Sequence, residues 1–595
     1  MSLLVVSGGF DTEIFGWRVT TNEPMRPMLI ASITISLFIL SGGRVRGGAR
    51  ISRAIVGANH RLLVGVMAAA VLAVGVTFAT TAASGADSYG YVSQAELWIA
   101  GDLSIEQPWQ ADIPWPSRRW SFAPLGYRPI EHDDNVWAIV PTYSPGLPML
   151  MALAKIVGGQ EALFWVVPLG GALLVIATYG IGCRLASSRA GLIGAWLVAT
   201  SPAFLFMLVW PMTDVPVAAA WALAFYFVLG RTRRSALAAG LAAAVAILIR
   251  PNLVWAAGIF GLWYAIRIWR DGSGARMRAL LDGAVYSIGV VPGIVTVAVF
   301  NNALYGSPSS SGYGSLGDMF SWVNVWPNLR RYSSWLIESQ TPVVLAGVAA
   351  LILPLRRMWS AAPDRTILVL VAAFVAALWL MYCAYLPFDE WWYLRFLLAS
   401  WPFLMVGVGA VAHAIMQTNR RLVSLAVALA VIGTGAAQIA IAIDRSPFDL
   451  WQGERRYVEV AQLVRGSTGE NSVILSMQHS GSLRYYGGRL TMRYDILDSD
   501  WLDRAVAWLA ERGVRSYLLV EEWELPQFRE RFAAEQTVEY TKMAPVFIYR
   551  GPATVLLYDL QHMGDPLAEP DVIQAPFAGM RSVPPAPPPT LVLTR

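Results

Sequence analysis

Long apolar runs separated by short polar connections occupy most of the first 443 positions of the chain. A run of about 18 or more apolar residues with few charges predicts a spanning helix, because lipid offers no partner for backbone amides. The pattern predicts a polytopic α-helical membrane protein with about 11–12 transmembrane helices. The expected spans are 26–41, 61–81, 160–182, 191–209, 214–230, 235–249, 253–267, 283–300, 336–354, 366–386, 396–416 and 422–442. The first is short enough to lie in the membrane interface instead, in which case the two termini lie on opposite sides.

Arginine separates the connections into two alternating sets. One set is rich in arginine and poor in acidic residues, and it includes the loops at Arg44, Arg184, Arg231, Arg267, Arg356 and Arg420. Positively charged loops are retained in the cytoplasm. We therefore predict that the long connection at about 82–143 and everything after 443 lie on the periplasmic or extracellular side. The arginine-rich usage and the lack of a cleavable signal fit a bacterial inner or plasma membrane.

The composition changes at about residue 444, where acidic residues become frequent and no run is long enough to span. Strand character is found at 472–477, 516–523, 545–550 and 553–560, and helical spacing at 501–513. This alternation predicts a soluble C-terminal α/β domain at 444–570. The transmembrane domain is expected at 1–443, with a large first outer loop at about 82–143. The proline-rich segment 571–595 is predicted to be disordered.

Composition excludes several classes of protein. Hydrophobic residues make up 56% of the chain and charged residues 14%, which excludes an ordinary soluble enzyme. The net charge of +5 arises largely from loop arginines, so it does not indicate a nucleic-acid partner. Cys183 and Cys383 lie far apart, and the five histidines show no metal-ligand spacing. A cysteine-based or zinc site is therefore not expected.

Charged residues gather at the outer ends of the predicted spans. These are Asp87, Asp214, Arg250, Asp389 and Arg395. Ionisable residues at a membrane boundary are costly to place, so they are candidates for a functional site. Two structural explanations stay open: an acid such as Asp214 caps a helix N-terminus, and arginines extend to lipid headgroups. Asp87 follows its helix, where a negative charge gains nothing from the helix dipole.

A carboxylate beside guanidinium groups at the outer leaflet suits transfer of a sugar from a lipid carrier. Arginine holds a phosphate through paired hydrogen bonds. The carboxylate can accept a proton from a hydroxyl group that attacks the sugar carbon. Because a lipid phosphate is a good leaving group, no general acid is required, and one carboxylate suffices where a glycoside hydrolase needs two.

The order of several segments carries a family resemblance. "DSYGYVSQAELWIAGDL" follows a spanning helix, and "YSPGLPMLMALA" (143–154), "TDVPVAAAWALAF" (213–225) and "NNALYGSPSSSGYG" (301–314) come later. In this order they resemble the GT-C superfamily of polyprenyl-phosphate-sugar-dependent glycosyltransferases, in the branch of protein O-mannosyltransferases and aminoarabinose transferases. The resemblance covers roughly residues 61–442. The chain departs from that pattern at Ser88, where a second acid is common, and at "SPGLP", where a Pro-Pro motif is common.

The resemblance implies an enzyme that takes a polyprenyl-phosphate-linked sugar as donor and a glycan, lipid or protein as acceptor. It implies that Asp87, in the first outer loop, is the catalytic base and that the tyrosines after it belong to the site. The residues expected to bind substrate are Arg250, Arg395, Asp214, Tyr89, Tyr91, Tyr143, Tyr313 and Asp389. The stretch around 305–314 is expected to be either a flexible cover over the substrate or a plain linker. No cofactor is required, although the acidic cluster could hold a divalent cation through oxygen ligands.

Two other classes of function are alternatives. A transporter or lipid flippase also has about twelve helices with polar groups between them, but transporters place ionisable residues near the bilayer midplane, often in repeated halves. Here the charges cluster at one surface and no repeat is found. A noncatalytic scaffold is the third class, and it leaves the charged residues at the outer face without a purpose.

Overall fold

The computed structural model describes residues 11–14, 17–20, 59–270, 272–314, 316–417, 421–562, 569–575, 582–589 and 591–593. The chain divides into two compact units, Met1–Leu63 and Val64–Arg595. In the first unit, β1 (Asp11–Ile14) pairs antiparallel with β2 (Trp17–Thr20). The predicted span at 26–41 lies outside the described residues.

Six helices among the described residues are long and apolar enough to cross a membrane, or seven spans if one bent pair is included. The six are α4 (His60–Thr77), α8 (Val166–Leu185), α14 (Ser273–Tyr305), α18 (Arg365–Cys383), the continuous stretch of η4 (Trp391–Ser400) and α19 (Trp401–Met416), and α20 (Arg421–Asp444). The chain therefore carries the composition of an integral membrane protein, as predicted.

The other predicted spans are helical but shorter or interrupted. They are α11 (Asp214–Val228), α12 (Arg233–Ile249), α13 (Trp255–Arg270), α16 (Val325–Gln340) and α17 (Val344–Ile352). The bent pair is α9 (Ser188–Ala199) and α10 (Pro202–Leu208), which meet at 60°. Ser201 caps α10 and Pro202 follows it, so the break has a local cause.

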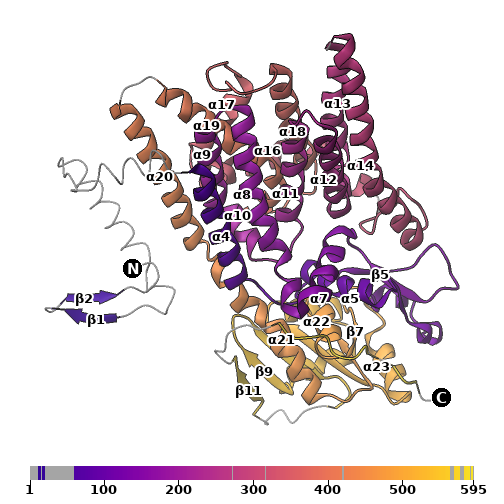
Figure 1. The fold of residues 1–595 in the computed structure, drawn as a ribbon. Coiled ribbons are helices and arrows are strands. Elements are labelled where there is room, and N and C mark those ends of the chain that lie inside the picture. Colours follow the sequence, from indigo (N-terminus) through magenta and orange to yellow (C-terminus); the bar gives the residue numbers. More distant parts are fainter. Residues whose placement is uncertain are drawn as a thin grey trace. The chain divides into compact units, whose positions relative to one another are not determined.

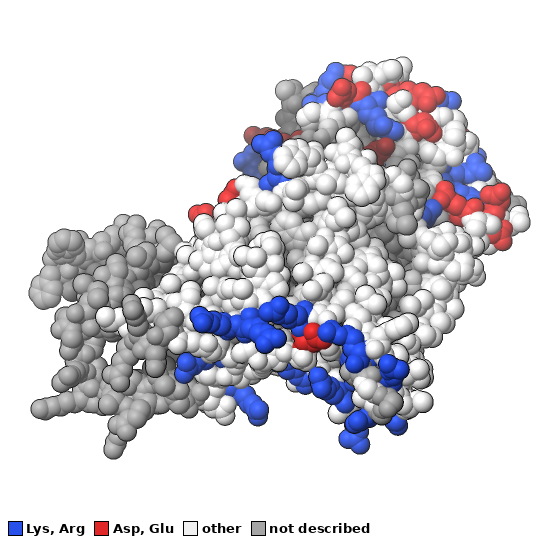
Figure 2. Space-filling model, turned by 90° about the horizontal axis from the view of Figure 1, so that it is seen from above, with Lys and Arg blue, Asp and Glu red and all other residues white. Residues whose placement is uncertain are grey.

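Basic side chains are concentrated on one face of the molecule. Seen from above the helices of Figure 1, this face carries a band of lysine and arginine with few acidic side chains (Figure 2). Arg231, between α11 and α12, and Arg233 and Arg234, at the start of α12, are exposed. Such an asymmetry is what the positive-inside rule requires of cytoplasmic loops, and the cytoplasmic assignment of this face stays a prediction.

The predicted outer loop at 82–143 has its own secondary structure. It contains α5 (Asp87–Ala100), η1 (Pro108–Asp112), α6 (Arg118–Ser121) and the strands β3 (Ile105–Glu106), β4 (Tyr127–Pro129) and β5 (Ala138–Pro141). The three strands form an antiparallel sheet in the order β3-β5-β4. A further helix, α7 (Gly146–Leu163), follows it and contacts α5. Asp87 is therefore the first residue of a helix rather than part of an open loop.

The C-terminal domain is α/β, as predicted, and its sheet has the order β11-β9-β10-β8-β6-β7. The strands are β6 (Ser472–Leu475), β7 (Leu490–Met492), β8 (Arg515–Glu521), β9 (Phe547–Arg550), β10 (Thr554–Asp559) and β11 (Asp571–Gln574). The helices are α21 (Leu450–Ser467), α22 (Ser480–Tyr485), α23 (Leu502–Glu511) and α24 (Leu525–Arg531), with η5 (Pro447–Asp449) and η6 (Gln536–Lys542). Strands β6, β7 and β8 are parallel, whereas β10 runs antiparallel to β8 and β9.

Part of the segment predicted to be disordered has described secondary structure. Residues 571–574 form β11, which pairs in parallel with β9. Farther on, the amide of Ala586 donates to the carbonyl of Tyr485 at 2.6 Å, and the amide of Val592 donates to Oδ1 of Asn471 at 3.1 Å. Without β11, β9 would be an edge strand with unpaired backbone groups. β11 supplies partners for these groups, which the proline content of the tail alone does not indicate.

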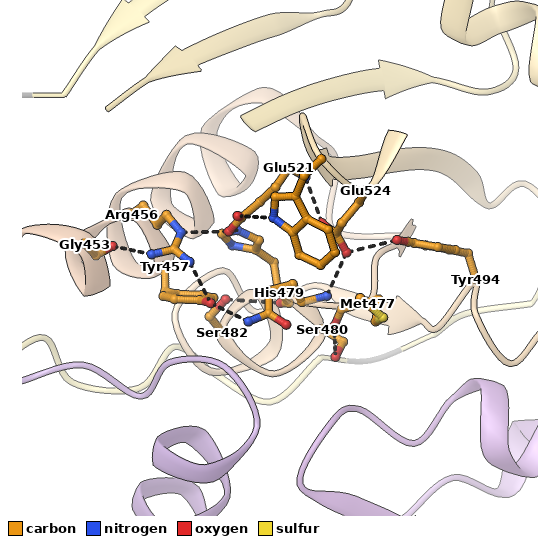
Figure 3. Close-up of polar contacts among 12 residues, drawn as sticks. Gly453, Arg456, Tyr457, Met477, His479, Ser480, Ser482, Tyr494, Glu521 and Glu524 are labelled. Carbon is orange, nitrogen blue, oxygen red and sulfur yellow. Dashed lines mark hydrogen bonds and ion pairs between the residues drawn. The ribbon is translucent and has the colours of Figure 1, made fainter. Parts of the chain in front are cut away.

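A network of buried polar groups lies at the ends of β6 and β8 (Figure 3). Nε2 of His479, which is fully buried, lies 3.1 Å from Oε1 of Glu521, and Nε of Arg456 donates to the same oxygen at 2.7 Å. Glu524 accepts from the hydroxyl of Tyr494 at 3.0 Å and from the amide of Glu521 at 2.8 Å. The network therefore joins α21 to the carboxyl ends of two parallel strands.

Two groups of this network shift the pH dependence of stability in opposite directions. Burial lowers the pKa of His479 below its usual 6.5, and the Glu521 carboxylate offsets this only partly. The unfolded chain then binds that proton more readily, so the contribution of His479 is present above pH 6.5 and is lost as the pH falls. Burial raises the pKa of Glu524 from 4.5 to about 7, so its contribution is present at low pH and is lost as the pH rises towards 7.

We expect His479→Gln and Glu524→Gln to change this pH dependence in opposite senses. Between about pH 7 and about pH 5, the Tm of His479→Gln should fall less on acidification than that of the wild type. The Tm of Glu524→Gln should fall more. Melting of the full-length protein in detergent across this range checks both variants. Profiles that shift in the same direction would contradict the assignment of the two groups.

Candidate functional site

Four charged side chains from four separate elements converge in the structure. Asp87 begins α5, Asp214 begins α11, Arg250 follows α12, and Arg395 lies in η4. Nη2 of Arg395 lies 3.3 Å from Oδ2 of Asp87, and its Nη1 lies 3.9 Å from Oδ2 of Asp214. Nη2 of Arg250 donates to Oδ1 of Asp214 at 2.8 Å. The predicted clustering of these four residues is therefore present as two carboxylates alternating with two guanidinium groups.

Asp214 is the buried centre of this cluster. Its side chain is 1% exposed and faces both guanidinium groups. Thr213 is the N-cap residue of α11, and its side chain makes no capping bond but accepts from Nη2 of Arg250 at 2.7 Å. Asp214 is thus an ion-pair partner of Arg250 and Arg395. A buried carboxylate requires such partners, because an uncompensated charge is expensive in a dry environment.

Asp87 is the accessible carboxylate of the cluster. Its side chain is 33% exposed, whereas that of Arg395 is 11% exposed. Oδ1 of Asp87 accepts a hydrogen bond from the hydroxyl of Tyr143 at 2.7 Å. Burial and the nearby Asp87 charge raise the pKa of Tyr143 well above 10, so this hydroxyl keeps its proton and acts as a donor. The carboxylate is therefore held on two sides and remains open on a third.

Arg395 has a buried Nε–H group with no hydrogen-bond partner among the described residues. The guanidinium lies over the rings of Tyr393 and Phe396, with Cζ 5.3 Å from each ring centroid. An unpartnered buried N–H is costly. An anionic ligand oxygen would satisfy it, and a planar guanidinium is well suited to phosphate.

Three predicted tyrosines line the site beside Asp87. The ring of Tyr143 lies 4.7 Å from that of Tyr91 and 5.8 Å from that of Tyr313, measured between centroids. The segment of Tyr313 packs on the first outer region: a Cβ on Gly312 would lie 2.1 Å from the carbonyl oxygen of Thr142. The stretch 305–314 is therefore packed, at Gly312, against Thr142, which precedes Tyr143, and is not an unattached linker.

Two predicted residues lie elsewhere. The Tyr89 ring packs against Gly481 of α22, where an added Cβ would lie 2.2 Å from Cδ1 of the ring. Asp389 is 86% exposed and pairs with Arg331 at 2.7 Å. The resemblance implies that the tyrosines after Asp87 belong to the site, but Tyr89 lies two positions after Asp87 in a helix, and residues two positions apart point about 200° away from each other. The structure thus separates both residues from the four-charge cluster.

Sequence reasoning missed three polar residues of the site. Besides Thr213, the hydroxyl of Tyr382 accepts from Nη1 of Arg250 at 3.5 Å and from Nδ2 of Asn252 at 3.2 Å. Asn252 lies two residues after Arg250 in "RPN", so its proximity to Arg250 in the sequence could have indicated it as a site residue. Tyr382 lies near the end of a uniformly apolar helix, α18, and its sequence surroundings carry no such signal.

The carboxylates of the site are already engaged by guanidinium groups. Asp214 lies between two arginines, and Asp87 contacts one. Across the part of the chain that the structure describes, no group of three or more His, Cys, Asp or Glu side chains is placed to hold a metal ion. This arrangement does not fit the oxygen cage that a divalent cation requires, so no step below is assigned to one.

Solved structures of other proteins resemble this chain. Comparison with protein-family profiles and with curated protein sequences gives no match. The structure of ArnT from Cupriavidus metallidurans bound to undecaprenyl phosphate is similar, with a TM-score of 0.53 and 14% identity over 85% of this chain and 99% of that chain. Its apo structure has a TM-score of 0.52 and 13% identity, over 84% of this chain and 97% of that chain. Arabinofuranosyltransferase AftD from Mycobacteria has a TM-score of 0.50 and 15% identity, over 85% of this chain and 40% of that chain.

At identities this low, the similarity establishes the fold. It covers 85% of this chain. The resemblance inferred from the order of the sequence segments is confirmed at this level: the chain has the GT-C fold.

Proposed function

We propose that this chain is an integral membrane glycosyltransferase that moves a sugar from a polyprenyl-phosphate carrier to an acceptor at the outer face of the membrane. One observation carries the proposal: the partly exposed Asp87 carboxylate contacts the buried Arg395, whose Nε–H has no hydrogen-bond partner among the described residues. A base and an anion-binding group thus lie side by side. The similar fold of ArnT, seen with undecaprenyl phosphate, supports a lipid phosphate as the anion.

The proposed reaction is a direct displacement. The acceptor hydroxyl gives its proton to Asp87 as its oxygen bonds to the anomeric carbon. The bond from that carbon to the phosphate oxygen breaks, and the electron pair leaves with the lipid phosphate. Arg395, and Arg250 behind it, stabilise the charge that develops on the leaving group. Attack opposite to the leaving phosphate inverts the configuration of the sugar. The acceptor is a glycan, lipid or protein hydroxyl.

Transfer of labelled sugar from a panel of polyprenyl-phosphate donors tests the proposal. The assay uses purified protein in vesicles with membrane extract as acceptor, and it includes a chelator arm. We expect label to appear in the acceptor with inverted configuration, and to do so without added divalent cation, because guanidinium groups already neutralise the carboxylates. Donor movement across vesicles with no bond formed, and no transfer from any donor, would favour the transporter alternative.

Gly90 allows Tyr143 to reach Asp87. A Cβ built on Gly90 would lie 2.1 Å from Cε2 of the Tyr143 ring, a distance that real contacts do not reach. Gly90→Ala should therefore displace the ring, remove the hydrogen bond to Asp87, and slow transfer by about tenfold to a hundredfold. The initial rate of purified protein checks this. Gly65→Ala is the matched control, since nothing lies within 4 Å of its added Cβ, and equal rates in the two variants would contradict the prediction.

A further inference from the structure

The segment that leads from α4 to Asp87 is held from both sides. The amide and hydroxyl of Thr80 donate to the carbonyl of Val209 at 2.8 and 3.2 Å, in the membrane domain. Three residues on, the amide of Ala83 donates to the hydroxyl of Tyr486 at 2.7 Å, and the hydroxyl of Ser84 donates to Glu454. Both of these partners belong to the C-terminal domain. We name residues 80–86 the approach segment.

The approach segment lies at a position where α/β sheets generally bind ligands. In the order β8-β6-β7, the chain leaves β6 towards β7 and leaves β8 towards the opposite side, so the two strands form a switch point. Ligands of open α/β sheets bind at the carboxyl ends of such strands. Here a Cβ on Gly85 would lie 3.7 Å from Nε2 of Gln478, which follows β6, and 3.8 Å from the hydroxyl of Tyr457. The enzyme's own chain therefore occupies this position.

The same domain also contacts the body of α5 (Figure 1). Gly481 of α22 lies under the Tyr89 ring, and the hydroxyl of Tyr485 donates to Oε1 of Glu96 at 2.8 Å. Arg484 donates to the carbonyl of Phe122 at 2.6 Å. These contacts explain why Tyr89 turns away from Asp87. They also mean that α5 is attached to the C-terminal domain at its start and along its length.

Displacement of the approach segment would move Asp87 directly. The amide of Tyr89 donates to the carbonyl of Ser84 at 3.1 Å, and that of Gly90 donates to the carbonyl of Ala86 at 2.9 Å. The first turn of α5 is therefore hydrogen-bonded to the approach segment, and Ala86, its N-cap residue, makes no side-chain capping bond. The start of the helix takes its position from Ser84 and its neighbours. A misplacement of about 1 Å at a reacting group can cost about a hundredfold in rate.

We propose that the C-terminal domain positions Asp87 by binding the approach segment at its switch point, with Tyr486 and Glu454 as positioning residues. This rests on the proposed function, in which Asp87 is the base. Tyr486 fixes a backbone amide four residues before Asp87, and Glu454 fixes the hydroxyl of Ser84. Both act through the main chain and neither touches the substrate. The domain is thus part of the catalytic apparatus even though it contributes no reacting group.

Removal of one oxygen atom tests the contact of Tyr486. Tyr486→Phe loses the bond to the Ala83 amide, and Tyr549→Phe, its matched control, loses a partly buried bond from its hydroxyl to Glu459 at 2.7 Å within the same domain. We expect Tyr486→Phe to lower kcat about tenfold with the donor KM unchanged, and Tyr549→Phe to leave both constants unchanged. Melting temperatures are compared in the same preparations, so that lost stability is distinguished from lost positioning.

The pair of Ser84 and Glu454 gives an independent test. Glu454→Ala should lower kcat about tenfold. Glu454→Gln should keep most of the wild-type kcat, because the amide oxygen still accepts from Ser84. The double variant Ser84→Ala with Glu454→Ala should lower kcat no more than either single variant. Unchanged kcat in Tyr486→Phe and Glu454→Ala, with Asp87→Asn inactive, would overturn the positioning role alone. Full activity of Asp87→Asn would overturn the proposed function itself.

Discussion

Asp87→Asn should abolish sugar transfer and leave the protein folded. The substituted amide has nearly the same shape, and its oxygen can still accept the hydrogen bond that Tyr143 donates at 2.7 Å. It cannot take a proton from the acceptor hydroxyl, however, and loss of a general base costs about 10²–10⁴ in rate. The loss should appear in kcat, with the donor KM little changed, because the arginines that bind phosphate remain.

Initial rates with saturating donor measure this effect. Asp102→Asn is the matched control: Asp102 lies two residues after the end of α5, is exposed, and accepts local bonds from Ser104 at 2.9 Å. Its rate should equal that of the wild type. A rate above about a tenth of wild type in Asp87→Asn would remove Asp87 from the role of base.

Asp214→Ala should destabilise the protein more than any other single change in the cluster. Asp214 is 1% exposed, and the side chains of its partners Arg250 and Arg395 are 15% and 11% exposed. Its removal leaves two largely buried guanidinium groups without the carboxylate between them. Breaking a buried ion pair in this way costs roughly 3–5 kcal/mol. Because both arginines would then be free to shift, we also expect transfer to be lost.

Thermal melting in detergent provides the comparison. Asp214→Asn keeps an oxygen that can accept from Arg250, so its Tm should lie between those of Asp214→Ala and wild type. Asp389→Ala removes an ion pair of the same kind at a site where the carboxylate is 86% exposed, and exposed pairs contribute about 0–1 kcal/mol. Similar Tm values for Asp214→Ala and Asp389→Ala would show that burial is not what makes Asp214 important.

Apolar runs and strand-like runs predict much of this fold, because each leaves a periodic trace in the sequence. The helices α4, α8, α18 and α20 and the strands β6, β8, β9 and β10 all lie at predicted runs. The helices α5 and α7 were not predicted. The sequence of α5 mixes small, polar and aromatic residues with no clear period, and the apolar run of α7 is interrupted by Lys155 and by the pair Gly158 and Gly159. The strand β11 was not predicted either, because a partner strand far away in sequence is what makes it a strand.

The sequence predicts the features of the site that depend on which side of the membrane a residue lies. It does not predict the features that depend on side-chain packing. Asp87, Asp214, Arg250 and Arg395 all lie at or near the ends of predicted spans on the predicted outer face, so their convergence follows from the predicted topology. Topology does not predict which tyrosine of "DSYGY" faces the site, because that prediction requires knowing that Asp87 starts a helix. Given α5, residues four apart share a face, which selects Tyr91 over Tyr89.

The hydrogen bond between Ala83 and Tyr486 joins residues 403 positions apart in the chain. A ribosome adds about 5–20 residues each second, so roughly 20–80 s separate the synthesis of these two residues. During that time the membrane helices are made and inserted, and α5 does not yet have its contacts with the C-terminal domain. Under the proposed function, the positioning of Asp87 is therefore a late event in the biogenesis of the protein, because a nascent chain that has not yet reached Tyr486 lacks the partner that fixes the base.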